Sequence, residues 1–189
     1  MKRIELELRG TTPLLMHSNV GVNPLHPLTL AKKAISGKRN KTEEDTIALF
    51  ELDWELGLYW NDEVGVYVPA QNIEATFRNA AKKIKKGSAV KEGLFVFPDF
   101  VKLLYPGPQT KEELKSDQRY RDIRVGVVQR ASIMVCRPRF DRWSLDVTLE
   151  YDPLIFGEET IIQIVETAGR YIGLCDYRPR YGKFEVIRK

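Results

Sequence analysis

The chain has 189 residues, of which 43% are hydrophobic and 30% are charged, a balance typical of a folded globular protein. No apolar run approaches the ~18 residues that a membrane span requires, and the first residues do not resemble a secretory signal, so we expect a cytoplasmic protein. The two cysteines, Cys136 and Cys175, are too few for a disulfide framework. Neither they nor His17 and His26 have further donors at metal-ligating spacing, so we expect no metal and no cofactor.

The net charge of +4 is distributed unevenly along the chain. Residues 71–91 carry +5 and residues 170–189 carry +4, so the remaining residues together carry −5. Concentrated positive charge is typical of a surface that binds phosphates, whereas charge that only keeps a protein soluble is spread out. The sequence therefore predicts a polyanionic partner.

The first third of the chain predicts one strand and two helices. Residues 2–9 alternate between apolar and charged side chains, which predicts a half-buried strand. Glycines and prolines then predict a loop to about residue 26, followed by a short helix from about Pro27. Thr42 and Asp45 resemble a capping box, so a further helix is expected to run to about residue 58.

The middle of the chain contains the clearest amphipathic helix. It follows a short predicted strand at residues 65–69, and its apolar stripe predicts an end at Gly87. Residues 93–105 predict a strand that Pro98 breaks. Residues 106–122 are charged, rich in turns and poor in core residues, so we expect an inserted, mobile projection.

The last third predicts strands around one more helix. Residues 123–140 are rich in β-branched side chains and predict a long strand region, in which Gly126 is a candidate bulge. The stretch RPRFDR (137–142) predicts a turn, and the alternating residues 143–151 are expected to complete an antiparallel hairpin. A helix is predicted from about residue 158 to 172, before a closing strand, GKFEVIR.

This order of elements predicts an α+β fold. It is the ferredoxin-like, RNA-recognition-type βαββαβ arrangement, an antiparallel sheet with two helices on one face and with inserted loops and a hairpin. The other face of such a sheet is free to receive a nucleic-acid strand. We expect a single domain, residues 1–189, with insertions at about 10–60 and 98–122.

Three stretches resemble the RAMP superfamily, which includes the backbone subunits of CRISPR effector complexes. The first strand enters TTPLLMH, like the family's first strand entering a Pro-Leu turn. The stretch VYVPAQNIEATFRNAAKK is similar to the family pattern that opens the first helix, and GLCDYRPRYGKFEV is similar to its glycine-rich loop before the last strand. Ala70 and Gln71 stand where family members usually have Gly and Ser, and the loop has few glycines beyond Gly173 and Gly182.

The resemblance implies an RNA-binding protein that associates with itself or with other effector subunits, without a membrane partner. It also implies that residues 98–122 form a thumb-like hairpin that reaches a neighbouring subunit. The leading hypothesis is therefore sequence-independent binding of RNA or another single-stranded nucleic acid, with cations at phosphates, tyrosine stacked on a base and glycine allowing close approach. The candidate binding residues are Arg78, Lys82, Lys85, Lys86, Arg137, Arg139, Arg178, Arg180, Tyr181, Gly182 and Lys183.

Two other classes of function stay open. Some RAMP relatives cleave RNA without a metal by using a histidine, and His17 and His26 are the candidate general bases for such an endonuclease. We expect a protein that is not an enzyme, because histidines in such loops are more often structural. A phage-type structural or assembly protein can use the same fold for a different purpose.

Overall fold

The computed structural model describes residues 1–128 and 131–189, and this part of the chain forms two compact units. The first unit contains Met1–Leu14, Trp60–Pro106 and Phe140–Lys189. The second contains Leu15–Tyr59 and Gly107–Arg139. The segments of the second unit overlap the insertions expected at 10–60 and 98–122. The expectation that residues 1–189 form a single domain stays a prediction.

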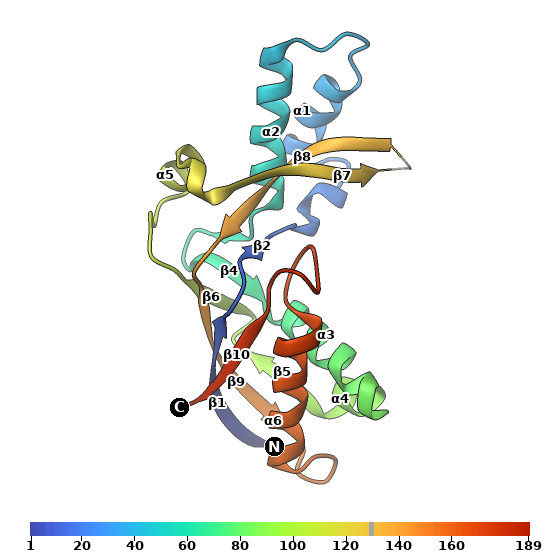
Figure 1. The fold of residues 1–189 in the computed structure, drawn as a ribbon, viewed down its shortest axis with the longest axis vertical. Helices are drawn as coiled ribbons and strands as arrows, with labels where there is room; N and C mark the ends of the chain where they lie inside the picture. The colour runs from blue at the N-terminus through green and yellow to red at the C-terminus, as the bar shows by residue number, and fades with distance from the viewer. Residues whose placement is uncertain (129–130) are drawn as a thin grey trace. The chain divides into compact units, whose positions relative to one another are not determined.

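The first unit is built on one antiparallel sheet (Figure 1). Its strands follow the spatial order β10-β1-β9-β6-β4-β3, and β5 also pairs with β9. The strands are β1 (Lys2–Gly10), β3 (Trp60–Asn61), β4 (Gly65–Pro69), β5 (Leu94–Phe97), β6 (Phe100–Leu104), β9 (Ser144–Tyr151) and β10 (Phe184–Arg188).

Helices α3 (Ala70–Ala81) and α6 (Glu158–Thr167) cover one face of this sheet (Figure 1). The chain order β1, α3, β5 with β6, β9, α6, β10 is the predicted βαββαβ arrangement, and the central strand order matches that of a ferredoxin-like sheet. The second strand of this fold is divided into β5 and β6 at Pro98, as the sequence predicts. The predicted fold class is confirmed.

The core of the first unit lies between the sheet and its two helices. Alternate residues of the central strands point to the helices, so Leu6, Leu8 and Leu145 are at most 1% exposed. Phe77 of α3 and Val165 of α6 are fully buried against them. Each such side chain contributes roughly 1.5–3 kcal/mol of burial free energy, so the apolar stripes of α3 and α6 hold both helices on this face.

The helix α3 ends earlier than the sequence predicts. It stops at Ala81, and a 3-10 turn, η2 (Lys82–Ile84), follows it. Lys85 then adopts the left-handed conformation, with φ of 58°, and Gly87 begins a short helix, α4 (Gly87–Gly93). The prediction that Gly87 ends this helix is therefore wrong. The left-handed backbone at Lys85 ends the helical turns, and Gly87 starts the next helix. At its own end, α6 continues as a π-helical turn, η4 (Ala168–Ile172), up to Gly173.

The second unit combines helices with a small sheet. A three-stranded sheet has the order β2-β8-β7, and the strands are β2 (Leu14–Leu15), β7 (Arg121–Val128) and β8 (Ala131–Phe140). Its helical elements are η1 (Asn19–Val22), α1 (Pro27–Ser36), α2 (Glu43–Gly57), α5 (Lys111–Ser116) and η3 (Gln118–Tyr120). The predicted capping box of α2 is confirmed, because Thr42 Oγ1 accepts from the Asp45 amide while the Asp45 carboxylate accepts from the Thr42 amide.

The region 121–140 differs from its prediction. It is a hairpin in which β7 pairs with β8, whereas β9 pairs with β1, β5 and β6. The pairing passes Gly126 opposite Ile133 without a bulge. Strand β8 continues to Phe140, so the stretch RPRFDR is mostly strand and not a turn. Gln129 and Arg130, which the long predicted strand includes, lie outside the described residues.

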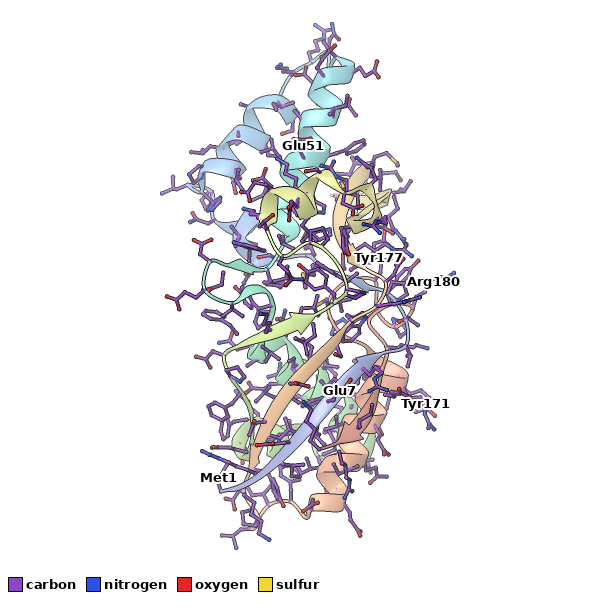
Figure 2. The ribbon with its side chains drawn as sticks, turned by 90° about the vertical axis from the view of Figure 1, so that its left-hand side faces the viewer. Met1, Glu7, Glu51, Tyr171, Tyr177 and Arg180 are labelled. Carbon is purple, nitrogen blue, oxygen red and sulfur yellow. The ribbon has the colours of Figure 1, made fainter. Side chains whose placement is uncertain are left out.

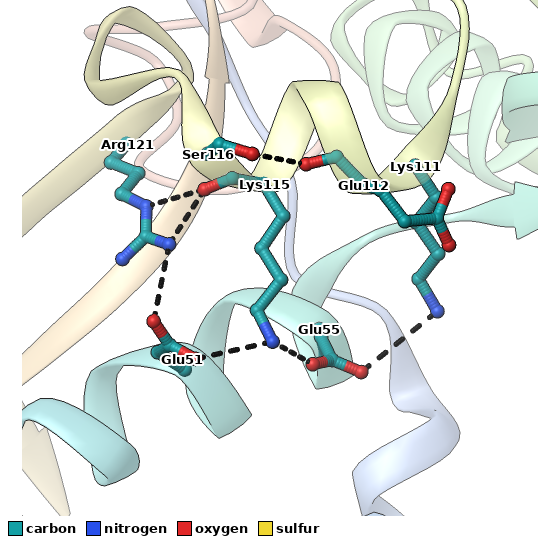
Figure 3. Close-up of polar contacts among 7 residues, drawn as sticks. All are labelled: Glu51, Glu55, Lys111, Glu112, Lys115, Ser116 and Arg121. Atoms are coloured by element: carbon teal, nitrogen blue, oxygen red, sulfur yellow. Dashed lines mark hydrogen bonds and ion pairs between the residues drawn. The ribbon is translucent and has the colours of Figure 1, made fainter.

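The segment 106–122 is anchored, which corrects the expectation of a projection without core residues. Leu114 is fully buried, and the indole N–H of Trp54 donates to the Tyr120 carbonyl oxygen at 2.8 Å. Figure 3 shows Lys115 of α5 between Glu51 and Glu55 of α2. Residues 100–104 belong to the sheet of the first unit, so a thumb-like role stays a prediction for the rest of 98–122.

Candidate nucleic-acid interface

The loop between η4 and β10 is closed by two glycines. Gly173 and Gly182 have φ of 81° and 70°, values that side-chain-bearing residues rarely adopt. The Leu174 amide donates to the Gly182 carbonyl oxygen at 2.8 Å, and the Gly182 amide donates to the Pro13 carbonyl oxygen at 2.8 Å. These bonds fix the base of the loop beside the end of β1, so the residues between them form a defined protrusion.

This loop presents cations to solvent. Arg178 and Arg180 are exposed, and Lys183 is half-buried. Within the described part of the chain, none of the three forms an ion pair with a carboxylate. Tyr181 is half-buried and packs edge-on against Tyr177, with ring centroids 6.4 Å apart. Figure 2 shows Tyr177 and Arg180 on this loop.

The second group of cations surrounds the end of α3. Arg78, Lys82, Lys85 and Lys91 line an open depression of about 670 Å³ together with Gly87, Ser88 and Glu92. Lys82 donates to the side-chain oxygen of Asn79 at 3.1 Å, and the Lys86 ammonium lies 5.9 Å from the centroid of the Phe156 ring. None of these basic side chains makes an ion pair with a carboxylate among the residues that the structure describes.

Tyr171 lies between cations from both basic segments of the sequence, and sequence reasoning missed it. The Lys83 ammonium lies 5.6 Å from the centroid of its ring, and the Arg170 guanidinium lies 6.0 Å from it. Tyr171 is 55% exposed, which leaves part of its surface accessible to a base. Tyr171 lies outside the apolar stripe of the helix predicted at about 158–172, and an aromatic side chain in that position could have indicated an exposed ring.

The loop and α3 are also in direct contact at their bases. The Thr76 hydroxyl, fully buried on α3, lies 3.4 Å from the Gly173 carbonyl oxygen. In Figure 2, Tyr171 and Arg180 lie along the same side of the first unit. The structure therefore brings the start of the loop, α3 and Tyr171 together in one unit.

The open face of the sheet has a different electrostatic character. Three of the cations on or beside it are paired with carboxylates: Arg3 with Glu150 at 2.5 Å, Arg9 with Glu7 at 3.0 Å, and Lys189 with Asp146 at 2.6 Å. Paired cations have little remaining attraction for phosphate. Lys102 of β6 is exposed on this face, so the sheet face presents less unpaired positive charge than the loop and the end of α3 do.

Arg137 and Arg139 belong to the second unit and do not lie at a hairpin tip. Both are within β8, which corrects the sequence prediction. Arg139 lies 3.0 Å from the carboxylate of Asp122, and Arg124 pairs with the same carboxylate. Burial of Asp122 favours a higher pKa, but the hydrogen bonds from Arg124 and Arg139 outweigh it and hold the pKa below its usual value.

The two histidines also lie in the second unit. His17 is exposed beside η1, and His26 precedes α1 without a side-chain capping bond. Among the described residues, no group of three or more His, Cys, Asp or Glu side chains could hold a metal ion.

Two further findings concern the described chain as a whole. Burial raises the pKa of the Cys136 thiol to about 11. No described helix is both long and apolar enough to cross a membrane.

Comparisons with known proteins identify the fold. No family model matches the sequence, and no curated protein matches it. The structure is similar to a chain in the cryo-EM structure of the Type III-B Cmr-beta complex bound to cognate target RNA, with a TM-score of 0.52 and 12% sequence identity. The similarity covers 99% of this chain but 61% of that one, so the protein spans about three fifths of its neighbour's length. The neighbour's fold agrees with the one that the RAMP resemblance implies.

Proposed function

We propose that the protein binds RNA, or another single-stranded nucleic acid, through its phosphate backbone as a subunit of a CRISPR-type effector complex. The loop cations Arg178, Arg180 and Lys183 contact phosphates, whereas Gly182, which is buried with its amide and carbonyl groups bonded within the protein, holds the base of the loop. The basic residues at the end of α3 extend the same surface. Tyr171 stacks on a base between them.

The contrast between paired and unpaired cations carries this proposal. On the sheet face, Arg3 and Arg9 lie 2.5 Å and 3.0 Å from glutamates and so have a carboxylate partner already. The loop and the depression beside α3 present exposed and half-buried cations that lack carboxylate partners in the described chain. When unpaired lysines and arginines bind phosphates, the counterions condensed on the nucleic acid are released. This release provides affinity that does not depend on the base sequence.

The fold comparison supports the biological context. The similar chain belongs to a multi-subunit complex that holds target RNA. Backbone subunits of such complexes repeat along a strand, so we expect this protein to associate side by side with copies of itself or with other subunits. A cytoplasmic location follows from that role.

Salt dependence tests the proposed function. Binding of a fluorescent uridine 20-mer is measured by anisotropy between 50 and 300 mM salt, and about six engaged phosphates give a log–log slope near −4, at roughly −0.7 per phosphate. The variant Arg180→Gln/Lys82→Gln should reduce the magnitude of this slope by about 1.4. Arg3→Gln/Arg9→Gln, which removes two paired cations, is the matched control and should leave the slope unchanged. Equal slopes for the two variants would contradict the proposed surface.

A further inference from the structure

The second unit contains a cavity that the proposed backbone contacts do not use. Its volume is about 470 Å³, within the range of small-molecule sites. Residues of η1, α1, α2 and the β7–β8 hairpin line it. Leu56 and Val135, both at most 8% exposed, provide apolar walls together with Ile133. The cavity therefore has the size of a small-molecule site, with these apolar walls and with polar lining residues that include His17, Asn19 and Arg137.

A buried carboxylate lines this cavity beside an ammonium group. Asp53 of α2 is 8% exposed, and the Lys32 ammonium of α1 lies 2.5 Å from its Oδ1 atom. Within the described chain, Lys32 is the one residue that pairs with Asp53. A buried carboxylate usually accepts several hydrogen bonds. Its second oxygen can therefore accept from a ligand in the cavity.

A hydroxyl of the same wall also lacks a partner. Thr29 lines the cavity, and its Oγ1 atom is buried without a hydrogen bond from or to any described residue. Buried polar atoms in native proteins are almost always hydrogen-bonded. Thr29 and Asp53 thus indicate, independently of each other, that a polar ligand completes this wall.

The order of donor and acceptor selects the ligand class. Lys32 donates and both oxygens of the adjacent Asp53 only accept, so the best-matched ligand edge has an acceptor beside two adjacent N–H donors. The Watson–Crick edge of guanine has this order, with O6 followed by N1–H and the N2 amino group. Adenine and cytosine can offer Asp53 an amino group, but neither has a neighbouring ring N–H for it. Uracil has a single ring N–H between two acceptors.

We propose that this cavity binds a guanine base. O6 accepts from the Lys32 ammonium, N1–H and the N2 amino group donate to Asp53, and the ring faces pack on Leu56 and Val135. The base belongs either to a free guanine nucleotide or to an unstacked guanosine of a bound RNA strand. The second source rests on the proposed function, whereas the first does not.

Nucleotide titrations test the cavity directly. Calorimetry with guanosine 5′-monophosphate should show binding about tenfold or more tighter than with the adenosine, cytidine or uridine monophosphates. Inosine monophosphate, which lacks the N2 amino group, should bind with intermediate affinity. Equal affinity for all five nucleotides, or no binding of any, would overturn the proposal.

A variant that prefers a different base shows that weaker guanine binding does not come from misfolding. In Asp53→Asn the side-chain carbonyl can still accept from N1–H, but the amide N–H now faces the 2-position. The variant should bind guanosine monophosphate about tenfold or more weakly and bind xanthosine monophosphate, whose O2 is an acceptor, more tightly than the wild type does. Leu56→Phe, which fills the cavity, should weaken binding of both nucleotides. Unchanged guanine preference in both variants would refute the site.

Two RNA strands distinguish the sources of the base. A uridine 20-mer with one central guanosine is compared with the all-uridine strand at one salt concentration. Tighter binding of the guanosine strand, lost in Asp53→Asn, would identify RNA as the source. Equal binding of both strands with retained affinity for guanosine monophosphate would identify the free nucleotide. Failure of the all-uridine strand to bind would contradict the proposed function and leave the nucleotide titration as the test of the cavity.

Discussion

The Lys83 ammonium lies 5.6 Å from the centre of the Tyr171 ring and so joins the turn after α3 to the turn after α6. Arg170 flanks the same ring at 6.0 Å. A cation at the ring raises the local positive potential without covering the whole aromatic surface. An exposed tyrosine held between two cations suits a nucleotide, because the base can stack while its phosphate contacts the cations.

Tyr171→Ala should weaken binding to a uridine 20-mer by about 1–3 kcal/mol, because one stacked base loses its platform. The measurement is fluorescence anisotropy at constant salt. Phe95, which is 40% exposed on the open sheet face, provides the matched control as Phe95→Ala. If both variants lose the same affinity, stacking on Tyr171 is not part of the interface.

Local patterns predicted most elements of the first unit. The alternation of residues 2–9 corresponds to β1, and the apolar stripe after Pro69 corresponds to α3. Burial of one strand face or one helix stripe repeats at a fixed period, so the sequence alone reveals it. The capping box at Thr42 is equally local and was also predicted correctly.

Features that depend on distant residues were not predictable in the same way. The pairing of β9 with β1 joins residues far apart in the sequence, and no local pattern distinguishes it from a hairpin with β8. The anchoring of α5 depends on Glu51 and Glu55, which lie on another helix. The same reason explains the candidate site: the sequence showed two basic segments, but only the fold brings Tyr171 between Lys83 and Arg170.

Gly182→Ala should destabilise the protein by at least about 1 kcal/mol, because alanine is strained at a positive φ. The φ of Gly182 is 70°, and an added Cβ would lie 2.0 Å from the Leu174 carbonyl oxygen. Chemical denaturation measures the loss, and RNA affinity should fall because the loop base is displaced. Gly157→Ala is the control, since an added Cβ there meets no atom within 4 Å. Equal stability of both variants would contradict the described loop conformation.

The Cys136 thiol should resist thiol–disulfide exchange in the native protein. It is fully buried, and burial raises its pKa to about 11, so very little thiolate is present at pH 8. The variant Cys175→Ser isolates this thiol, and its reaction with a chromogenic disulfide reagent is followed with and without denaturant. Rapid reaction without denaturant would show that the core around Cys136 opens readily.

The Asp122 carboxylate should make the stability of the second unit depend on acidic pH. Its side chain is 5% exposed, and hydrogen bonds from Arg124 and Arg139 lower its pKa in the folded state. In the unfolded chain the pKa is about 3.9. The carboxylate therefore stabilises the fold fully above that value, and this stabilisation is lost as the pH falls through the lower folded-state pKa.

Substitution of Asp122 tests this linkage in two ways. At pH 7, Asp122→Ala should cost about 3 kcal/mol of unfolding free energy, because it leaves two partly buried arginines without their carboxylate. Asp122→Asn should flatten the decrease in stability below pH 4. Glu112→Gln, which removes an exposed carboxylate of the same unit, should keep the wild-type pH profile. A wild-type profile for Asp122→Asn would show that its pairing with Arg124 and Arg139 does not stabilise the protein in solution.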